Sequence, residues 1–301
     1  MYDLVIIGSG PAGLGAAIYG VRAGLKTLVL EKNPMSGGQV LNTYEVDNYL
    51  GLPGINGFDL GVKFREHADK LGAAFRETEV EAIEDLGNKK VLHTPEGDIE
   101  TKTVILAMGA HHAKLGVPGE EELSGMGVSY CATCDGAFFK NRTVAVVGGG
   151  DVAVEDAIFL ARNCTKVYLI HRRDSLRAAK VLQDTLFTLP NVEVLWNTTV
   201  EEIKGEDMVE SLVIHKEDKQ DELKVDGVFI AVGIHPETAI CNNLVKCDDN
   251  GYVLADETCK TSVPGVYAAG DIRKKPLRQV ITAVADGANA AVSAASYVLS
   301  N

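Results

Sequence analysis

Two segments of the chain share one pattern: an apolar strand, a glycine-rich turn, a helix and a second apolar strand. The first is YDLVIIGSGPAGLGAAIYGVRAGLKTLVLEK, in which the motif G-x-G-x-x-G begins at Gly8. The second is RTVAVVGGGDVAVEDAIFLARNCTKVYLIHRRD, in which G-x-G-x-x-A begins at Gly148. Strand, turn, helix and strand in this order form a βαβ unit with parallel strands. The duplication predicts an α/β fold with two Rossmann-like, doubly wound domains of three layers each.

The two copies end differently, and the difference bears on the nucleotide that each would bind. In such a turn, the glycines let the backbone approach a pyrophosphate at the helix N-terminus. The first copy ends in Glu31, and a carboxylate there suits a ribose hydroxyl. The second ends in a basic cluster made of His171, Arg172, Arg173 and Arg177. Guanidinium groups pair with a ribose 2′-phosphate, so the second turn is predicted to prefer NADPH over NADH. The alternative is a solvated basic helix start.

Length and charge narrow the class of protein. The chain has 301 residues, 46% of them hydrophobic and 24% charged, which allows about two domains. Its net charge of -13 argues against a nucleic-acid partner and against an anionic-membrane anchor. The first strand begins near Tyr2, and no uncharged apolar run reaches about 18 residues. We therefore expect a cytoplasmic protein without a membrane segment.

Another strand followed by a glycine turn, VPGVYAAGD, lies near the end of the sequence. If this segment returns to the first glycine turn, the middle of the chain is an insertion joined by two crossings. Segments that contain proline or glycine suggest these crossings at residues 114–122 and 233–239. We predict a discontinuous domain of residues 1–113 and 241–301, with residues 114–240 inserted.

The other predicted elements are helices at 58–71, 152–163 and 279–299 and strands at 74–83, 90–94, 99–106 and 166–170. No low-complexity tract interrupts them. Asp286 and Asn289 within the last helix exclude a membrane span, so its alanine-rich face is expected to pack against other helices.

Only two of the six cysteines, Cys131 and Cys134, have a motif spacing, C-x-x-C. This argues against a secreted disulfide framework. The other four are expected to be buried apolar residues: Cys164, Cys241, Cys247 and Cys259. The pair fits a redox dithiol, half of a zinc site, or packing. Zinc would need two more ligands, and the chain has no second C-x-x-C or H-x₃₋₅-H. No metal is therefore expected, and redox use is favoured.

The residues that follow the dithiol leave two questions open. Asp135 comes directly after Cys134, and burial by neighbouring apolar residues would raise its pKa into a range suited to acid–base work. The alternative for Asp135 is a helix N-cap. The adjacent Phe138 and Phe139 are either core residues or part of a docking surface.

Six stretches occur together: GSGPAG, GGQ at residues 37–39, CATCDG, GGGDVAVEDA, HRRDSLRA, and AAGD with Arg278-Gln279. Over essentially the whole chain they resemble the low-molecular-weight, bacterial-type thioredoxin reductases. The resemblance implies an FAD-dependent, NADPH-linked homodimer, in which a discontinuous FAD domain holds an inserted NADPH domain that carries the dithiol. Hydride would pass from NADPH to FAD and electrons then to the disulfide. The dithiol would reduce thioredoxin or a thioredoxin-like protein by exchange.

The resemblance also implies the residues of each site. For FAD these are Ser9, Gly10, Pro11, Ala12, Glu31, Gly38, Gln39, Asn48, Val80, Ala107, Gly109, Gly270, Asp271, Arg278, Gln279 and Val280. For NADPH they are Gly148, Gly149, Gly150, Asp151, Val152, Ala153, His171, Arg172, Arg173 and Arg177. Cys131 and Cys134 would form the redox disulfide, with Cys134 facing the flavin and Cys131 attacking the partner. Asp135 would move protons beside them.

The chain departs from the family pattern at three positions. Met108 stands where the family usually has a threonine, at a position that the resemblance places close to the flavin. The hydroxyl of that threonine is therefore missing in this chain. Val152 replaces a small polar residue of the second glycine motif, which changes local packing. Met126 stands where arginine is common, at a position linked to docking of the protein substrate. The last departure puts the identity of the partner in question.

The dithiol and the NADPH site share one predicted domain, yet each must meet the same flavin ring. Two groups cannot occupy one face of the ring together. We infer that the inserted domain rotates on its two crossings between half-reactions.

Other functions remain as alternatives. Glutathione-reductase-like enzymes carry a C-x₄-C after the first βαβ unit, and no cysteine stands there in this chain. Ferredoxin–NADP reductases lack the dithiol, and dithiol oxidases would not need the basic cluster. A glutaredoxin-like or peroxiredoxin-type protein is an alternative partner. From another class, a non-catalytic FAD redox sensor would switch its disulfide without NADPH.

Overall fold

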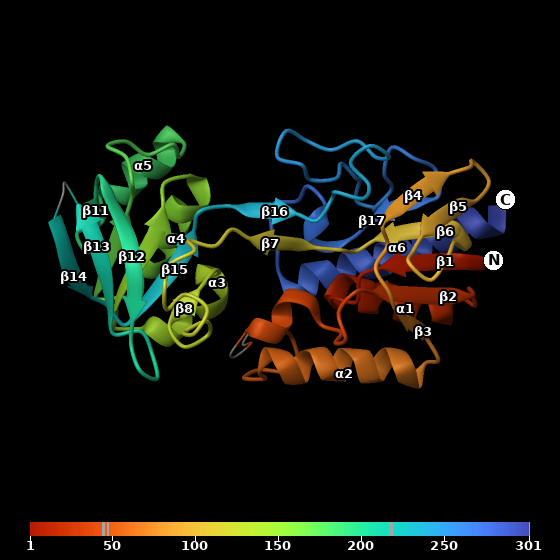
Figure 1. Cartoon of the computed structure of the whole chain (residues 1–301), viewed down its shortest axis with the longest axis horizontal. Coiled ribbons are helices and arrows are strands. Elements are labelled where there is room, and N and C mark those ends of the chain that lie inside the picture. Colours follow the sequence, from red (N-terminus) through yellow and green to blue (C-terminus); the bar gives the residue numbers. More distant parts are fainter. Residues whose placement is uncertain (44–45, 47, 217–218, 301) are drawn as a thin grey trace. The chain divides into compact units, whose positions relative to one another are not determined.

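The computed structural model describes residues 1–43, 46, 48–216 and 219–300. The chain divides into two compact units (Figure 1). Unit 1 contains residues 1–111 and 235–301, and unit 2 contains residues 112–234. Unit 2 is therefore continuous in sequence and interrupts unit 1. Within the described residues, no helix is long and apolar enough to cross a lipid bilayer.

The strands of unit 1 are β1 (Tyr2–Ile7), β2 (Thr27–Glu31), β3 (Ala74–Glu77), β4 (Ala82–Asp85), β5 (Lys90–His93), β6 (Ile99–Leu106) and β17 (Val266–Ala268). Its helices are α1 (Pro11–Arg22), α2 (Gly57–Lys70) and α6 (Val280–Ser300), with short 3₁₀ helices η1 (Gly38–Asn42) and η3 (Gly270–Ile272). The predicted helices 58–71 and 279–299 agree with α2 and α6 to within one residue. For α2 the reason is local, because the Asn56 side chain accepts a hydrogen bond from the Asp59 amide at 2.8 Å and caps the helix.

The sheet of unit 1 is a parallel βαβ sheet with an antiparallel extension. Strands run in the order β3-β2-β1-β6, all parallel, and β17 pairs in parallel with the second half of β6. The first half of β6 pairs instead with β5, which pairs with β4, both in antiparallel fashion. Strand β6 thus has different neighbours along its length, and β17 brings a late segment of the chain into the same sheet as β1.

Side chains of β1 fill both faces of this sheet. Leu4 and Ile6 lie in an apolar cluster with α1 and α6, whereas Val5 and Ile7 lie in a second cluster with Leu92 of β5. All four are nearly inaccessible to solvent. A strand that is buried on both faces needs a continuous apolar run, which is why its sequence shows no alternation.

Small residues let helices α1 and α6 pack at close range. A Cβ on Gly287 would lie 2.1 Å from the Ala12 carbonyl oxygen, and one on Gly15 would lie 2.9 Å from that of Val284. Ala290 of α6 is fully buried in the same cluster. The expectation that the alanine-rich face of the last helix packs against other helices is confirmed.

One predicted strand, 74–83, is wrong. The structure has β3 and β4 in its place, and they lie at opposite edges of the sheet. Between them the chain turns away at Thr78, whose amide donates to the Glu31 carbonyl at 2.9 Å and whose hydroxyl bonds to Glu96. Polar alternation continues through the break, so the sequence pattern alone does not reveal it.

Unit 2 contains β8 (Val128–Ser129), β9 (Thr143–Gly148), β10 (Lys166–Ile170), β11 (Val192–Leu195), β12 (Thr198–Lys204), β13 (Ser211–Lys216), β14 (Lys219–Lys224) and β15 (Gly227–Ala231). Its helices are α3 (Ala132–Asp135), α4 (Asp151–Ala161) and α5 (Lys180–Leu186), with η2 (Gly136–Phe139). Parallel strands run in the order β11-β10-β9-β15-β8, and β12-β13-β14 form a separate antiparallel sheet.

The two parallel sheets share the spatial order of their central strands. In each, the first strand of the glycine motif lies between the second strand of the motif and a later strand, and a short strand pairs with the outer side of that later strand. The short strand is β17 in unit 1 and β8 in unit 2, and β8 precedes the glycine motif in the chain. In unit 2, α4 covers one face of the sheet, and apolar residues of β12 and β13 cover the other. The predicted fold class, two Rossmann-like folds of three layers with one inserted in the other, is confirmed.

The two crossings are short strands that pair with each other. They are β7 (Ala110–His112) and β16 (Ile234–Pro236), which form a two-stranded sheet. The Ala113 amide donates to the Gly233 carbonyl at 2.9 Å, and the Glu237 amide donates to the Gly109 carbonyl at 3.0 Å. The chain therefore leaves and re-enters unit 1 through one pair of strands.

Candidate functional site

The first glycine turn, between β1 and α1, requires glycine at two points. Gly8 has a φ of 99°, and a Cβ there would lie 2.5 Å from the Ala107 carbonyl oxygen. A Cβ on Gly13 would lie 1.9 Å from the Gly8 carbonyl oxygen. Helix α1 begins at Pro11 without a side-chain cap, because its N-cap residue is Gly10. The first-turn amides of α1 are thus left for an anionic group such as a pyrophosphate.

Glu31, at the end of β2, lies against this turn. Its Oε2 accepts hydrogen bonds from the amide and from the hydroxyl of Ser9, both at 2.8 Å. Its Oε1 accepts from the amide and the side-chain nitrogen of Asn33, both at 3.0 Å. The carboxylate is therefore fixed beside the glycine turn, where it suits the ribose of a nucleotide whose pyrophosphate lies on the turn.

The segment after β17 adds two buried polar atoms without a partner. A Cβ on Gly270 would lie 2.9 Å from the Ala12 Cβ, which places η3 against α1. In the described part of the chain, Oδ1 of Asp271 and Nε of Arg278 are buried and have no hydrogen-bond partner. Burial raises the pKa of Asp271, and Lys275 and Arg278 oppose this in part. Buried polar atoms nearly always have partners, so these two atoms fit the polar groups of a bound FAD.

One further loop segment, at Gly37 and Gly38, lies against the first turn. The Gly37 amide donates to the Ser9 carbonyl at 2.9 Å, and a Cβ on Gly38 would lie 3.3 Å from the Gly10 Cα. These contacts bring the start of η1 to the turn. The predicted residues that the structure gathers here are Ser9, Gly10, Pro11, Ala12, Glu31, Gly38, Ala107 and Gly270.

The remaining predicted FAD residues lie in unit 1 at varied places. Nε2 of Gln39 donates to the Ala110 carbonyl, and Nδ2 of Asn48 donates to Oε1 of Gln279 at 2.9 Å. Gly109 has a φ of 73° and precedes β7, and Val280 begins α6. The Val80 side chain lies in the core and is therefore not available to a ligand.

The second glycine turn, between β9 and α4, repeats the steric requirement of the first. A Cβ on Gly148 would lie 2.4 Å from the Ala231 carbonyl oxygen and 2.7 Å from the Ala153 Cβ. At Gly150 an added Cβ would meet open space among the described residues. Helix α4 has no side-chain cap either. The turn is tightly packed on its inner side and open where its helix begins, as a phosphate site requires.

The predicted basic cluster separates into one buried residue and three exposed ones. His171 is 5% exposed, and its ring fills the space beneath Gly149, where a Cβ would lie 2.2 Å from the ring. Its Nε2 lies 3.0 Å from the Ser175 carbonyl oxygen. Burial lowers the pKa of His171, so the ring is neutral near pH 7 and supports the turn by packing. The exposed members are Arg172, Arg173 and Arg177.

Two hydrogen bonds tie the basic loop to the second turn. The Arg177 amide donates to the Gly149 carbonyl at 2.7 Å, and the Ala179 amide donates to Oδ1 of Asp151 at 2.7 Å. The loop that follows β10 is thereby held against the start of α4. The structure thus brings the glycine motif and the arginines together as one basic surface on a chain whose net charge is -13.

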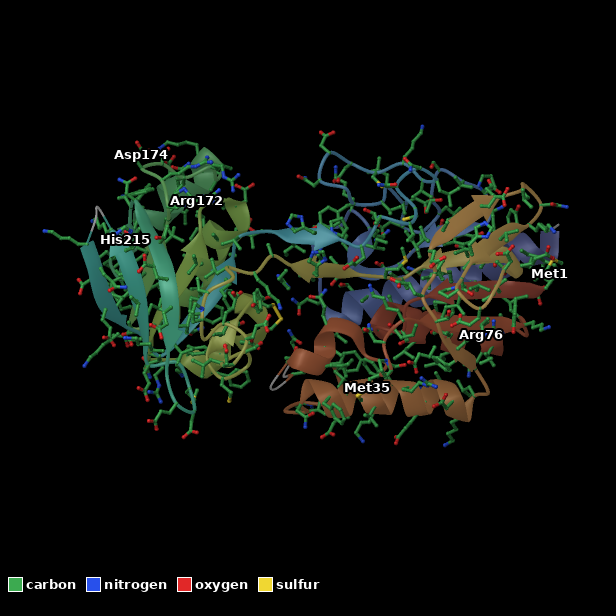
Figure 2. All side chains as sticks on the ribbon, viewed as in Figure 1. Met1, Met35, Arg76, Arg172, Asp174 and His215 are labelled. Carbon is green, nitrogen blue, oxygen red and sulfur yellow. A yellow bond between two sulfur atoms is a disulfide. The ribbon has the colours of Figure 1, made fainter. Side chains whose placement is uncertain are left out.

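Cys131 and Cys134 form a disulfide, seen as a yellow bond in Figure 2, with their Cα atoms 5.3 Å apart. Cys131 is the N-cap residue of the short helix α3. Behind the disulfide, Ala132 is fully buried, and a Cβ on Gly136 would lie 3.0 Å from Cδ2 of Leu160 in α4. The dithiol segment is therefore packed on the same helix that begins at the second glycine turn.

Asp135 is held beside the disulfide by Ser129. The Ser129 hydroxyl donates to Oδ2 of Asp135 at 2.5 Å, and Oδ1 is buried without a partner in the described chain. Burial raises the pKa of Asp135, and the Ser129 hydrogen bond partly opposes this. A carboxyl in this environment is suited to proton transfer. Asp135 does stand at the N-cap position of η2, but its side chain makes no capping hydrogen bond there, and Cys131 occupies the N-cap of α3.

The phenylalanine pair and the departures from the family pattern differ in exposure. Phe139 is 7% exposed and belongs to the core, whereas Phe138 is 41% exposed and does not. A docking role for Phe138 stays a prediction. Met108 packs against the core of unit 1. Met126 and Val152 are 40% and 48% exposed, and both are open to a partner or ligand.

Sequence reasoning missed Glu120, which is 1% exposed. Its carboxylate accepts from the amides of Leu115 and Gly116, at 3.0 and 2.7 Å, and from the Tyr130 hydroxyl at 2.8 Å. Burial, and then the hydrogen bond to Glu120, raise the pKa of Tyr130. Glu120 thus links the segment after β7 to the residue before Cys131. It stands in the acidic run PGEEEL, which resembles a solvated surface, so its sequence gives no signal of this role.

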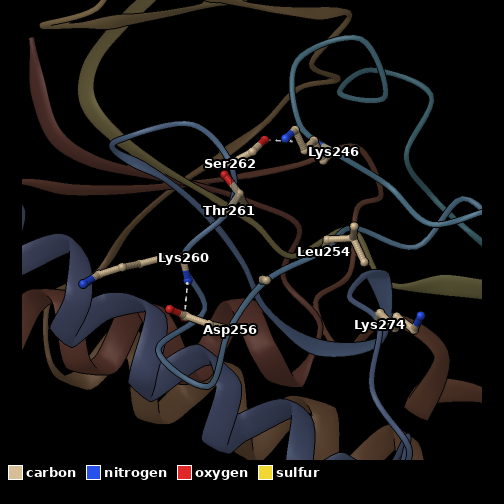
Figure 3. A pocket seen from close by; sticks show the side chains of 8 residues that line it. Lys246, Leu254, Asp256, Lys260, Thr261, Ser262 and Lys274 are labelled. Carbon is tan, nitrogen blue, oxygen red and sulfur yellow. Dashed lines mark hydrogen bonds between the residues drawn. The ribbon is translucent and has the colours of Figure 1, made fainter.

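A hollow of about 380 Å³ in unit 1 is not a candidate site. It is lined by Lys246, Leu254, Ala255, Asp256, Lys260, Thr261, Ser262 and Lys274 (Figure 3). The Lys246 amide donates to Oγ of Ser262 and the Lys260 amide to Oδ1 of Asp256, at 3.0 and 3.1 Å. Figure 3 shows the Lys260 and Lys274 side chains pointing away from each other, so their charges do not converge on one ligand.

Comparisons with known proteins agree with this geometry. Residues 2–287 match the family described as pyridine nucleotide-disulphide oxidoreductase. The chain is 47% identical to a thioredoxin reductase of Listeria monocytogenes, over 99% of this chain and 94% of that protein. It is 45% identical to one of Bacillus subtilis, over 99% and 95% of the two chains. The crystal structure of a thioredoxin reductase from Streptococcus pyogenes matches with a TM-score of 0.97 at 43% identity, covering 100% of this chain and 99% of that one.

These matches extend over both units and include both glycine turns. The resemblance found in the sequence is confirmed, and with it the class of enzyme and its FAD and NADPH dependence. The chain belongs to the pyridine nucleotide-disulphide oxidoreductase family.

Proposed function

We propose that the protein reduces the disulfide of thioredoxin with electrons from NADPH, by way of FAD and the Cys131–Cys134 disulfide. The observation that carries the proposal is in unit 2. There the disulfide is packed on α4, and the same helix begins at a glycine turn that is tied to three exposed arginines. A redox disulfide packed against a helix that begins at a dinucleotide turn fits an oxidoreductase that draws on a nicotinamide cofactor.

We assign FAD to unit 1 and NADPH to unit 2. Unit 1 is supported by Glu31 at the first turn and by the unpartnered atoms of Asp271 and Arg278. The sequence suggests that the inserted domain begins after residue 113 and ends at residue 240. In the structure, unit 2 begins after residue 111 and ends at residue 234.

Bound FAD supplies the chemistry that converts a hydride donor into a reductant for sulfur. The chain's own residues bind and position the reactants. Glu31 would hold a ribose hydroxyl of the flavin nucleotide, and the three exposed arginines would hold the 2′-phosphate of NADPH. Cys131 would attack the partner disulfide, Cys134 would resolve the mixed disulfide, and Asp135 would hold the proton that these steps exchange.

Replacement of either redox cysteine should stop thioredoxin reduction. We expect Cys131→Ser and Cys134→Ser to abolish thioredoxin-dependent oxidation of NADPH, because a serine hydroxyl forms no mixed disulfide. Steady-state consumption of NADPH by the purified FAD-loaded protein, with oxidised thioredoxin, measures this. The control is Cys247→Ser, a free and partly exposed thiol outside the motif, which should keep full activity.

Residual turnover in either serine variant would contradict the proposal. If NADPH bleaches the flavin of the unaltered protein but thioredoxin gives no turnover, the dithiol chemistry stands and the partner is another protein disulfide. Glutaredoxin-like and peroxiredoxin-type proteins are then the ones to assay. The exposed Met126, at the position linked to partner docking, is the observation that favours this second candidate.

Removal of the arginines should weaken the binding of NADPH and leave the binding of NADH unchanged. Each charge-assisted hydrogen bond to a phosphate contributes about 1.5–3 kcal/mol, so Arg172→Ala with Arg173→Ala should raise the KM for NADPH at least about tenfold. The KM for NADH should stay unchanged, because NADH lacks the 2′-phosphate. The matched control is Arg142→Ala, an exposed arginine of unit 2 that pairs with Asp226 at 3.1 Å. Equal changes for both cofactors would place the 2′-phosphate elsewhere.

We infer further that unit 2 rotates against unit 1 during turnover. In support, the dithiol and the proposed NADPH residues all belong to residues 112–234, whereas all the proposed FAD residues belong to unit 1. The single pair of strands β7 and β16 joins the units, as a hinge requires.

A non-reducible covalent cross-link between the two units should therefore stop steady-state turnover. A protein locked in one state should still complete one half-reaction, either flavin reduction by NADPH or disulfide exchange. Stopped-flow absorbance of cross-linked and untreated protein separates these steps. Full turnover in the cross-linked protein would refute the rotation.

We also propose that the protein is a homodimer of the cytoplasm. Helices α1, α2 and α6 carry large apolar side chains that are nearly half exposed, at Tyr19, Phe58 and Ile281, as a subunit interface requires. Light scattering should give twice the chain mass of 32.1 kDa, and a mass of one chain would refute the dimer. The four free cysteines fit a reducing compartment, and cell fractionation tests that location.

A further inference from the structure

Ser129 is a buried polar residue on a fixed element beside the disulfide. It ends β8 and pairs with Phe229 of β15 in the parallel sheet of unit 2. Its exposure is 5%. A side chain on a paired strand is held more closely than one on a loop, so the Ser129 hydroxyl has a defined place relative to the residues that follow it.

The hydroxyl of Ser129 stands between the dithiol and its acid. Oγ accepts a hydrogen bond from the Cys131 amide at 3.1 Å and donates to Oδ2 of Asp135 at 2.5 Å. Its other acceptor within reach, the Cys131 carbonyl, is farther away at 3.4 Å. Because the amide fills one acceptor site of Oγ, the hydroxyl proton is directed toward the carboxyl. Oδ2 is thus occupied as an acceptor, while Oδ1 is buried and unpartnered in the described chain.

We propose that Ser129 is a positioning residue that keeps the proton of Asp135 on Oδ1, from which it passes to the sulfur that leaves during disulfide exchange. The proposal rests on the proposed function and adds a residue to it. A protonated carboxyl carries its proton on either oxygen, and the hydrogen bond from Ser129 makes Oδ2 the acceptor and Oδ1 the donor. Without Ser129, the acid would lose its orientation but keep its proton.

The proton count of the exchange defines where Asp135 acts. The Cys131 thiol loses its proton to water, and the thiolate attacks the partner disulfide: a bond forms between Cys131 and one partner sulfur, and the other partner sulfur leaves. That leaving sulfur takes the proton from Oδ1 of Asp135. Cys134 then gives its own proton to Asp135 and attacks Cys131, so the second partner sulfur leaves and takes a proton from water. Two thiols are oxidised to one disulfide, and one partner disulfide is reduced to two thiols.

The requirement for a proton depends on the leaving thiol, and this provides the test. An alkyl thiol has a pKa of about 8.5, so its sulfur leaves more readily when an acid protonates it, whereas an acidic aromatic thiol leaves as a thiolate. The FAD-loaded full chain, reduced with NADPH, is mixed with 2-hydroxyethyl disulfide and, separately, with 5,5′-dithiobis(2-nitrobenzoate). Exchange rates are measured for the unaltered protein, Ser129→Ala, Asp135→Asn and the double variant.

We expect Ser129→Ala to slow exchange with the alkyl disulfide roughly tenfold, less than the roughly hundredfold or greater loss that removal of a general acid causes. The rate with the aromatic disulfide should not change. In the double variant, Ser129→Ala should add nothing to the loss caused by Asp135→Asn, because Ser129 acts only through that carboxyl. A structural role for Ser129 would slow both disulfides alike.

Equal slowing of both disulfides, or a double variant whose loss is the product of the two single losses, would overturn the proposal. If Ser129→Ala has a lowered thermal unfolding midpoint, Ser129→Thr gives the second measurement, because it keeps a hydroxyl and should keep the rate with the alkyl disulfide, whereas loss of that rate in Ser129→Thr would also count against the proposal. Both probes are small molecules, so the result stands apart from the partner. Absence of turnover with thioredoxin would refute the proposed partner. Equal effects of Ser129→Ala on the alkyl and the aromatic disulfide would refute the role of Ser129.

Discussion

In both units, the carbonyl edge of the sheet meets a helix so closely that a Cβ has no room. At Gly13 of α1 the added atom would lie 1.9 Å from the Gly8 carbonyl oxygen, and at Gly148 it would lie 2.7 Å from the Cβ of Ala153 in α4. This approach fixes the direction of α1 and α4 relative to their strands, and it leaves the first-turn amides of each helix uncapped. The end of the next strand then lies beside the same turn. In folds of this kind, the residue at that strand end lies near the ribose and distinguishes a 2′-hydroxyl from a 2′-phosphate.

Among the residues that the structure describes, each unit has one carboxyl with a buried oxygen that lacks a hydrogen-bond partner. They are Asp271 in unit 1 and Asp135 in unit 2, and burial raises the pKa of both. An unsatisfied buried polar group costs about 1–3 kcal/mol of folding stability. Such atoms are retained where a ligand or a reacting group supplies the missing hydrogen bond. Asp271 belongs to the proposed flavin site, and Asp135 lies beside the dithiol. Stability and function are thus opposed at these two residues.

The parts of the structure that could be predicted from the sequence are those set by local contacts. The helix that Asn56 caps and the approach of Gly13 to the Gly8 carbonyl depend on neighbours a few residues away. The strand 74–83 failed because the chain changes sheet edges at Thr78, and that change depends on Glu31 and Glu96, which are distant in sequence. His171 was grouped with the arginines that follow it, yet its ring is buried beneath Gly149. Glu120 and Ser129 show their roles only through contacts that the fold creates.

The position of unit 2 within the chain also sets the order in which the protein can be completed as it is synthesised. Residues 112–234 contain all the strands of their own parallel sheet, so unit 2 can fold as soon as it has emerged. By then unit 1 still lacks β17, which pairs with β6, and α6, which packs on α1. The first strands of unit 1 therefore stay without these partners until the whole of unit 2 has been synthesised. The segment that carries Asp271 arrives in this last stage, so the first turn acquires its full set of proposed flavin ligands only when nearly the entire chain has been translated.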